Sequence, residues 1–186
     1  MGTGILLLKD RPWSEFKAFN GIKIPVAISF RDMLDPIKNW VWLKRDLRVS
    51  DHEPLLLATE SAGRVAAFFA FEPEWLNHPS TSEYHLQFVC DSLSELQLEL
   101  AKLNIPLIIF QSSILDVLTQ LKARGLKRLY SHEETGLMWS YKRDVLVKNW
   151  CREHSVEWKE SRQFSVIRGI KNRNRWNGIR KKILKQ

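Results

Sequence analysis

Residues 41–58 read VWLKRDLRVSDHEPLLLA, and this stretch decides the fold. A short apolar run, VWL, leads into a loop dense in charge, and the loop leads into a second apolar run, LLLA. The pattern predicts a buried strand, a charged loop and a helix. Open α/β sheets bind ligands where a strand passes through a loop into a helix, so this loop is the first candidate site.

Size and composition indicate a globular protein. The chain has 186 residues, of which 44% are hydrophobic and 27% charged, enough for one domain with a real core. Its apolar runs are too short for a membrane span or a signal peptide, so we expect a cytoplasmic protein that does not bind a membrane. Cys90 and Cys151 lack C-x-x-C spacing and are expected to be buried on helices, with a disulfide or metal role as the minority alternative.

The positive charge is confined to one end of the chain. The net charge is +8, yet residues 162–186 hold nine Lys or Arg and no Asp or Glu, which leaves the remainder nearly neutral. Two interpretations of this tail remain open. It is either a solvated linker or a weak, salt-sensitive contact with DNA or another nucleic acid. The candidate phosphate contacts are Arg168, Lys171, Arg173 and Arg175.

Beyond residue 39, strand-like and helix-like segments alternate. We expect strands at about 39–43, 64–71, 105–111, 127–131 and 155–160, and helices at 52–62, 83–103, 114–124 and 137–154. Asp51 and Ser113 are the expected N-caps of the first and third helices. The fold class is therefore α/β: a five-stranded, doubly wound parallel sheet, Rossmann-like, of order 3-2-1-4-5 and flanked by helices.

The sequence divides into three parts: an N-terminal extension at 1–38, an α/β domain at 39–161 and a basic tail at 162–186. The proposed strand order places the loops at 44–51 and 132–136 beside the same crevice. The candidate binding residues there are Lys44, Arg45, Asp46, His132, Glu133 and Glu134. The alternative is that Arg45, Asp46, Arg48 and Asp51 pair with one another and fix the first loop, while Glu133 and Glu134 are simply solvated.

Several common site motifs are missing from the sequence. No glycine-rich phosphate loop follows the first strand, and HExxH, paired CxxC and GxSxG are absent. The sequence therefore assigns no catalytic residue and no metal ligand.

Three motifs in order resemble the DNA photolyase and cryptochrome family. The opening stretch is similar to W-[FL]-[RK]-x-D-L-R-x-x-D, and SHEETGLMWSYKRDVLV at 131–147 looks like S-H-E-E-T-G-x-x-W-x-Y-x-R-D. A third stretch, QFSVIRGIKNRNRW at 163–176, is similar to Q-N-G-V-[VI]-R-x-L-[KR]-x-R-D-x-W in one branch of the family. The resemblance covers about residues 39–176.

The resemblance implies a role for the whole domain. The family's amino-terminal α/β domain can hold an antenna chromophore, and its repair chemistry belongs to a larger helical domain that binds FAD. We therefore expect this chain to bind, at most, a deazaflavin, lumazine, flavin or folate antenna. No FAD and no photolyase (lyase) activity in light-dependent DNA repair are expected of this chain alone. The alternative is an interaction module that pairs with a separate FAD-binding half.

The chain also departs from the family pattern. Phe164-Ser165 stands where the third motif has Asn-Gly, Asn174 replaces its Asp, and no folate motif is visible after the fourth strand, which counts against folate. Trp42, Trp139, Trp150 and Trp158 occupy core-like positions. We interpret these four as packing residues and not as an electron-transfer chain.

Overall fold

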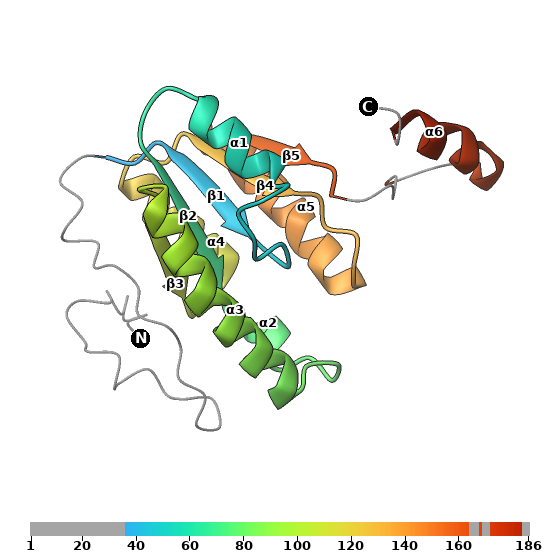
Figure 1. Cartoon of the computed structure of the whole chain (residues 1–186), viewed down its shortest axis with the longest axis horizontal. Helices are drawn as coiled ribbons and strands as arrows, with labels where there is room; N and C mark the ends of the chain where they lie inside the picture. Colours follow the sequence, from blue (N-terminus) through green and yellow to red (C-terminus); the bar gives the residue numbers. More distant parts are fainter. Residues whose placement is uncertain (1–35, 164–167, 169–171, 184–186) are drawn as a thin grey trace.

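The computed structural model describes residues 36–163, 168 and 172–183. Five parallel strands form one sheet of order β3-β2-β1-β4-β5, which confirms the predicted fold class and strand order (Figure 1). The strands are β1 (Asn39–Leu43), β2 (Val65–Ala70), β3 (Leu107–Phe110), β4 (Arg128–His132) and β5 (Glu157–Ser161). The predicted extension at 1–38 lies almost wholly outside the described residues.

The crossover helices lie where the apolar pattern predicts them. They are α1 (Glu53–Glu60), α3 (Glu83–Lys102), α4 (Ile114–Ala123) and α5 (Met138–Glu153). The sequence did not predict the one-turn helix α2 (Pro73–Leu76), which follows β2. A four-residue helix is too short to show a 3.6-residue apolar period, so pattern reading has no means of finding it.

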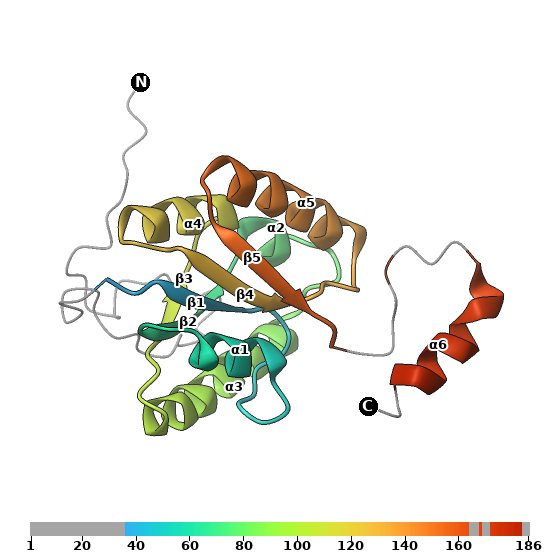
Figure 2. The same ribbon diagram turned by 90° about the horizontal axis from the view of Figure 1, so that it is seen from above.

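Helices cover both faces of the sheet, as Figure 2 shows with α1 and α3 on one side and α4 and α5 on the other. Side chains alternate along each strand, so Trp40 and Trp42 of β1 face one helical layer, and Val41 and Leu43 face the other. Both faces of β1 are therefore apolar, which explains the unbroken hydrophobic run from Trp40 to Leu43.

The N-caps of two helices were predicted from the sequence, and one of the two predictions is confirmed. Ser113 caps α4 as predicted, because its side chain accepts a hydrogen bond from the Asp116 backbone N–H. The prediction for α1 was wrong: the N-cap is His52, whose Nδ1 accepts the Leu55 N–H. Asp51 lies one residue too early and takes a left-handed conformation with φ of 50°. The other ring nitrogen of His52, Nε2, lies 2.8 Å from the Asp46 carboxylate.

Both cysteines are buried on helices, as the sequence indicated. Cys90 of α3 and Cys151 of α5 belong to hydrophobic clusters on opposite faces of the sheet, so no disulfide can join them. Burial raises the pKa of the Cys90 thiol to about 11 and that of Cys151 to about 12. Neither thiol is therefore an activated nucleophile at neutral pH.

The basic tail contains helical structure that the sequence reading did not assign. A 3₁₀ turn, η3 (Arg173–Arg175), leads into α6 (Trp176–Ile183). Figures 1 and 2 both show α6 set apart from the sheet and its covering helices. Among the described residues, no helix is both long enough and apolar enough to cross a membrane.

Candidate functional site

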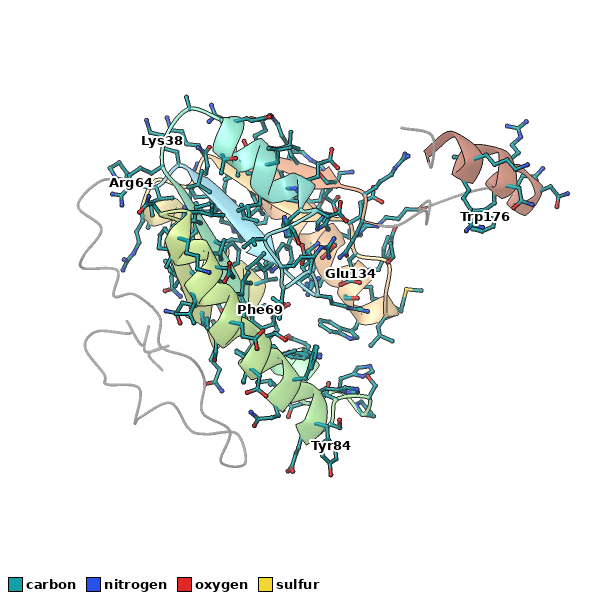
Figure 3. The ribbon with its side chains drawn as sticks, viewed as in Figure 1. Lys38, Arg64, Phe69, Tyr84, Glu134 and Trp176 are labelled. Carbon is teal, nitrogen blue, oxygen red and sulfur yellow. The ribbon has the colours of Figure 1, made fainter. Side chains whose placement is uncertain are left out.

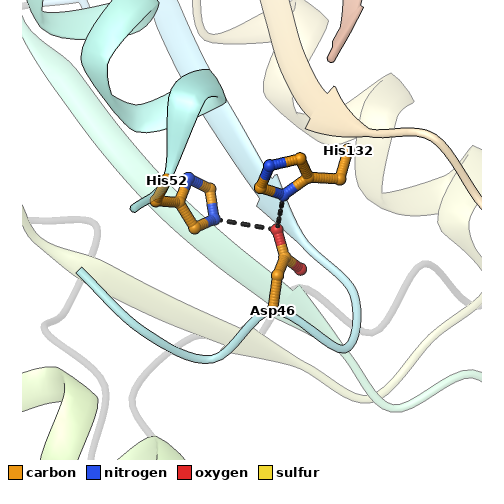
Figure 4. Close-up of side chains that lie close together, drawn as sticks. All are labelled: Asp46, His52 and His132. Carbon is orange, nitrogen blue, oxygen red and sulfur yellow. Dashed lines mark hydrogen bonds and ion pairs between the residues drawn. The ribbon is translucent and has the colours of Figure 1, made fainter. Parts of the chain in front are cut away.

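The candidate site lies at the carboxyl edge of the sheet, where the loops after β1 and β4 meet. Asp46 is at its base and is only 1% exposed. Its Oδ2 lies 2.6 Å from His132 Nδ1 and 2.8 Å from His52 Nε2, while its Oδ1 accepts the Lys44 backbone N–H (Figure 4). Burial alone would raise the Asp46 pKa, but the two histidines together hold it well below its ordinary range.

Asp46, His52 and His132 form a buried group of metal-ligand side chains. A histidine that binds a metal through Nε2 carries its proton on Nδ1 and donates it to a neighbouring acceptor. Here His52 Nδ1 faces the Leu55 N–H, which is a donor, so the proton must be on Nε2. Nε2 lies 2.8 Å from Asp46 Oδ2, but the angle at the Nε2–H is not that of a hydrogen bond. We therefore interpret the cluster as a loop-fixing triad and not as a metal site.

A second buried group centres on the Asp144 carboxylate of α5. Lys44 Nζ lies 2.9 Å from Asp144 Oδ2 and also donates to the His132 carbonyl oxygen. Arg143 and Arg168 bring two further cations to the same carboxylate, at 2.9 and 3.3 Å. Burial lowers the pKa of Lys44, and the charge of Asp144 opposes that shift. Lys44 Nζ also lies 4.3 Å from the centre of the Trp42 ring, a cation–π contact.

Arg143 links this group to two acidic side chains. It donates to Glu72 Oε1 at 2.6 Å and lies 3.6 Å from Glu134 Oε2. Burial opposes the charge on Arg143, but Glu72 and Asp144 outweigh it and raise the guanidinium pKa. Burial raises the pKa of Glu72 despite its contact with Arg143. Each buried charge described here therefore has a partner of opposite sign within the network.

Arg45 and Glu134 form the exposed rim of the site. Arg45 Nη2 donates to Glu134 Oε1 at 3.0 Å, and the same oxygen accepts the Gly136 backbone N–H. The Arg45 side chain is 59% exposed, whereas that of Glu134 is 7% exposed. A Cβ added at Gly136 would fall 1.7 Å from Arg45 Nη2, so the guanidinium can lie there only because residue 136 has no side chain.

A pocket of about 580 Å³ opens above this charged base, between α3 and the first residues of α5. Its aromatic lining comes from Trp42, Phe69, Trp75, Phe88 and Trp139. Its charged lining comes from Lys44, Arg45, Arg48, Glu72, Glu134 and Arg143. Two of the lining residues, Phe69 and Glu134, are labelled in Figure 3. Small-molecule sites have this size and this mixture of apolar walls with a few polar groups.

The structure divides the predicted site residues into two sets. Lys44, Arg45 and Glu134 line the pocket, whereas Asp46 and His132 are absent from its lining and form the buried triad instead. Glu133 is half-buried, and its backbone N–H donates to the Ser161 carbonyl oxygen.

The candidate phosphate contacts of the tail lie in different surroundings. Arg168 is bound within the network around Asp144, and Arg175 is exposed. Lys171 and the side chain of Arg173 lie outside the described residues.

Sequence reading missed His52, Glu72, Arg143 and Asp144, together with most of the aromatic wall. A signal existed for two of them, because Arg143-Asp144 is the R-D pair of the second family-like motif. The alternative of self-pairing charges holds for one pair within the first loop. Arg48 donates to the Ser50 and Asp51 carbonyl oxygens and lies 3.7 Å from the Asp51 carboxylate. Arg45 and Asp46 instead find their partners outside that loop.

Comparison of the sequence and the fold with those of known proteins finds relatives of one kind. A family model described as DNA photolyase matches residues 39–168. The deoxyribodipyrimidine photo-lyase of Buchnera aphidicola is 32% identical over 134 residues, which is 72% of this chain and 27% of that protein. A chloroplastic/mitochondrial cryptochrome DASH of Solanum lycopersicum is 30% identical over 102 residues, 51% of this chain and 18% of that protein.

Among solved structures, an archaeal photolyase from Sulfolobus tokodaii has the same fold. It superimposes with a TM-score of 0.67 at 24% identity, and the match covers 81% of this chain and 35% of that chain. It is described as holding two FAD molecules, with the implication of a novel light-harvesting cofactor. The chain thus spans about a fifth to a third of the length of these relatives.

Proposed function

Because the chain belongs to the DNA photolyase family, we propose that its α/β domain binds an antenna chromophore in the 580 Å³ pocket. The protein would then belong to a light-dependent DNA-repair or light-sensing system. The observation that carries this proposal is the pocket itself, which has aromatic walls and a charged rim at the carboxyl edge of the sheet. Under this proposal the described residues bind and orient a ligand, and they make or break no covalent bond.

The pocket lining favours a flat ligand with acceptor groups. Aromatic side chains offer stacking surfaces for fused rings. The pocket's two carboxylates, Glu72 and Glu134, already accept hydrogen bonds from Arg143 and Arg45, which leaves them less acceptor capacity for the donors of a ligand. Arg45 is largely exposed and has further N–H groups to offer. Deazaflavins, lumazines and flavins combine fused rings with carbonyl and anionic groups, and folate is the least supported of the four.

We expect the purified protein to retain one of these chromophores after desalting. Incubation with each compound, followed by gel filtration, should leave an absorbance band at longer wavelength than that of tryptophan. Arg45→Gln should weaken the retained compound's binding roughly tenfold, because it removes a charge-assisted hydrogen bond. Gly136→Ala should act similarly, because its methyl group displaces the Arg45 guanidinium.

Gly178→Ala is the matched control for Gly136→Ala, since no atom lies within 4 Å of a Cβ at that position. Binding by that variant should equal wild type. A wild-type protein that retains none of the compounds at micromolar concentration would overturn the antenna proposal.

A second candidate function is docking of another protein over the pocket mouth. Large apolar side chains are exposed on the two helices that contribute to the pocket wall: Phe88 of α3 is 71% exposed, and Met138 and Tyr141 of α5 are 68% and 51% exposed. Phe88 also lines the pocket, so the exposed surface is continuous with it. Apolar groupings of this kind mark interaction sites. We propose that they pack against an FAD-binding helical partner, whether or not that partner is separately encoded.

The docking proposal predicts binding to the remainder of a relative. We expect the part of the Buchnera aphidicola photo-lyase outside its matched segment to bind this chain, measured by isothermal titration calorimetry. Met138→Asp should weaken that binding at least tenfold, because it places a charge in an apolar contact. Leu103→Asp is the control, since Leu103 is 53% exposed at the other end of α3. Equal losses in the two variants, or no wild-type binding, would contradict the proposal.

A further inference from the structure

Arg168 belongs to the basic tail by sequence, but its guanidinium is bound within the domain. Nε donates to the Glu134 carbonyl oxygen at 2.7 Å, and Nη1 donates to Glu160 Oε1 at 3.0 Å. Nη2 donates to Asp144 Oδ2 at 3.3 Å. The Arg168 side chain is only 24% exposed. All three nitrogens therefore have protein partners, which is unlike an arginine that presents its guanidinium to a phosphate.

The three acceptors belong to three separate parts of the fold. Glu134 is in the loop after β4 and lines the pocket, Glu160 is in β5, and Asp144 is in α5. One side chain thus joins the pocket wall, the last strand and the helix beside it. A planar group with five donors in fixed directions can hold three acceptors at once, which a lysine ammonium does less precisely.

We propose that Arg168 is a positioning residue for the pocket: it holds the Glu134 backbone, and so fixes the wall on which Arg45 is anchored. Arg168, which follows β5 in the sequence, is then a structural part of the ligand site. Linkage makes the relation reciprocal, because a ligand that needs Glu134 in place stabilises the Arg168 contacts, and those contacts strengthen ligand binding. The ligand half of this inference rests on the proposed antenna function; the contacts themselves do not.

The ligand-free test compares Arg168→Gln with Arg162→Gln. Arg162 is exposed in the same segment, and its substitution removes the same charge. We expect Arg168→Gln to lower Tm by about 5 °C at pH 7, and Arg162→Gln to leave Tm unchanged.

The pH profile separates positioning by charge from simple packing. Burial raises the Glu160 pKa, and Lys44 and Arg168 oppose that shift, so loss of Arg168 should raise it further. A carboxyl group whose pKa is higher in the folded than in the unfolded state lowers the stability of the protein as pH rises from the unfolded pKa through the folded pKa. The Tm difference between wild type and Arg168→Gln should therefore shrink towards acid pH, where Glu160 is protonated. A Tm difference that is absent, or equal at all pH values, would overturn the proposal.

The ligand test measures retention of the chromophore that wild type binds. Arg168→Gln should weaken it about tenfold, with Arg162→Gln near wild type, and Arg168→Lys should recover part of the loss. If wild type binds no chromophore, the antenna proposal fails while the ligand-free test still decides the contacts. A DNA oligonucleotide titration tests whether Arg168 instead contacts nucleic acid. If Arg168→Gln reduces DNA binding as much as Arg175→Gln does and leaves chromophore binding unchanged, the inference is wrong.

Discussion

Replacing Asp144 with asparagine is expected to lower the free energy of unfolding by about 3–5 kcal/mol, because it removes one partner of a buried ion-pair group. The substitution keeps the shape of the side chain and deletes only the charge that Lys44, Arg143 and Arg168 share. Lys44 should account for most of the loss, because its side chain is only 5% exposed and its charge would lose its carboxylate partner. Urea unfolding at pH 7 measures the loss.

The pH dependence identifies the cause of that loss. Asp144 is the main group that opposes the effect of burial on the Lys44 pKa, so that pKa should fall further in Asp144→Asn. A lysine whose folded pKa is depressed binds fewer protons in the folded state than in the unfolded state, so stability rises with pH. The variant should therefore regain part of its stability as pH is raised from neutral towards the Lys44 range.

Asp91→Asn is the matched control, because Asp91 is an exposed helical aspartate bonded to Gln87. It should change the free energy of unfolding by less than about 0.5 kcal/mol. A loss of similar size in both variants would show that Asp144 does not hold the network together.

The sheet could be predicted because its information is local. Strands such as β1 and β2 are continuous apolar runs between charged or polar loops, and such runs indicate strands covered on both faces. The strand order followed from the rule for doubly wound sheets, and it correctly brought the loops after β1 and β4 together.

The site could be predicted only in part, because its partners are remote in sequence. Lys44 and Asp144 are 100 residues apart, and Arg45 and Glu134 are 89 apart. No periodicity links such positions, so the sequence named charged loops without saying which charge meets which. His52 escaped notice because its role depends on a helix cap shifted by one residue, a displacement below the precision of boundary prediction.

Replacing Asp46 with asparagine is the second change with a large expected effect, about 3 kcal/mol at pH 7. Asp46 is a buried carboxylate that joins the loop after β1 to His132 and to the cap of α1.

Because the folded pKa of Asp46 lies below the unfolded value of 3.8, its contribution to stability is fully present above that pH and disappears as pH falls through the folded pKa. The difference between wild type and Asp46→Asn should thus be present at neutral pH and shrink between about pH 4 and pH 2. Asp51→Asn, at a side chain 99% exposed, is the control and should follow wild type throughout. Unfolding curves across this pH range test the prediction, and a difference that does not shrink in acid would show that the Asp46 charge is not what stabilises the loop.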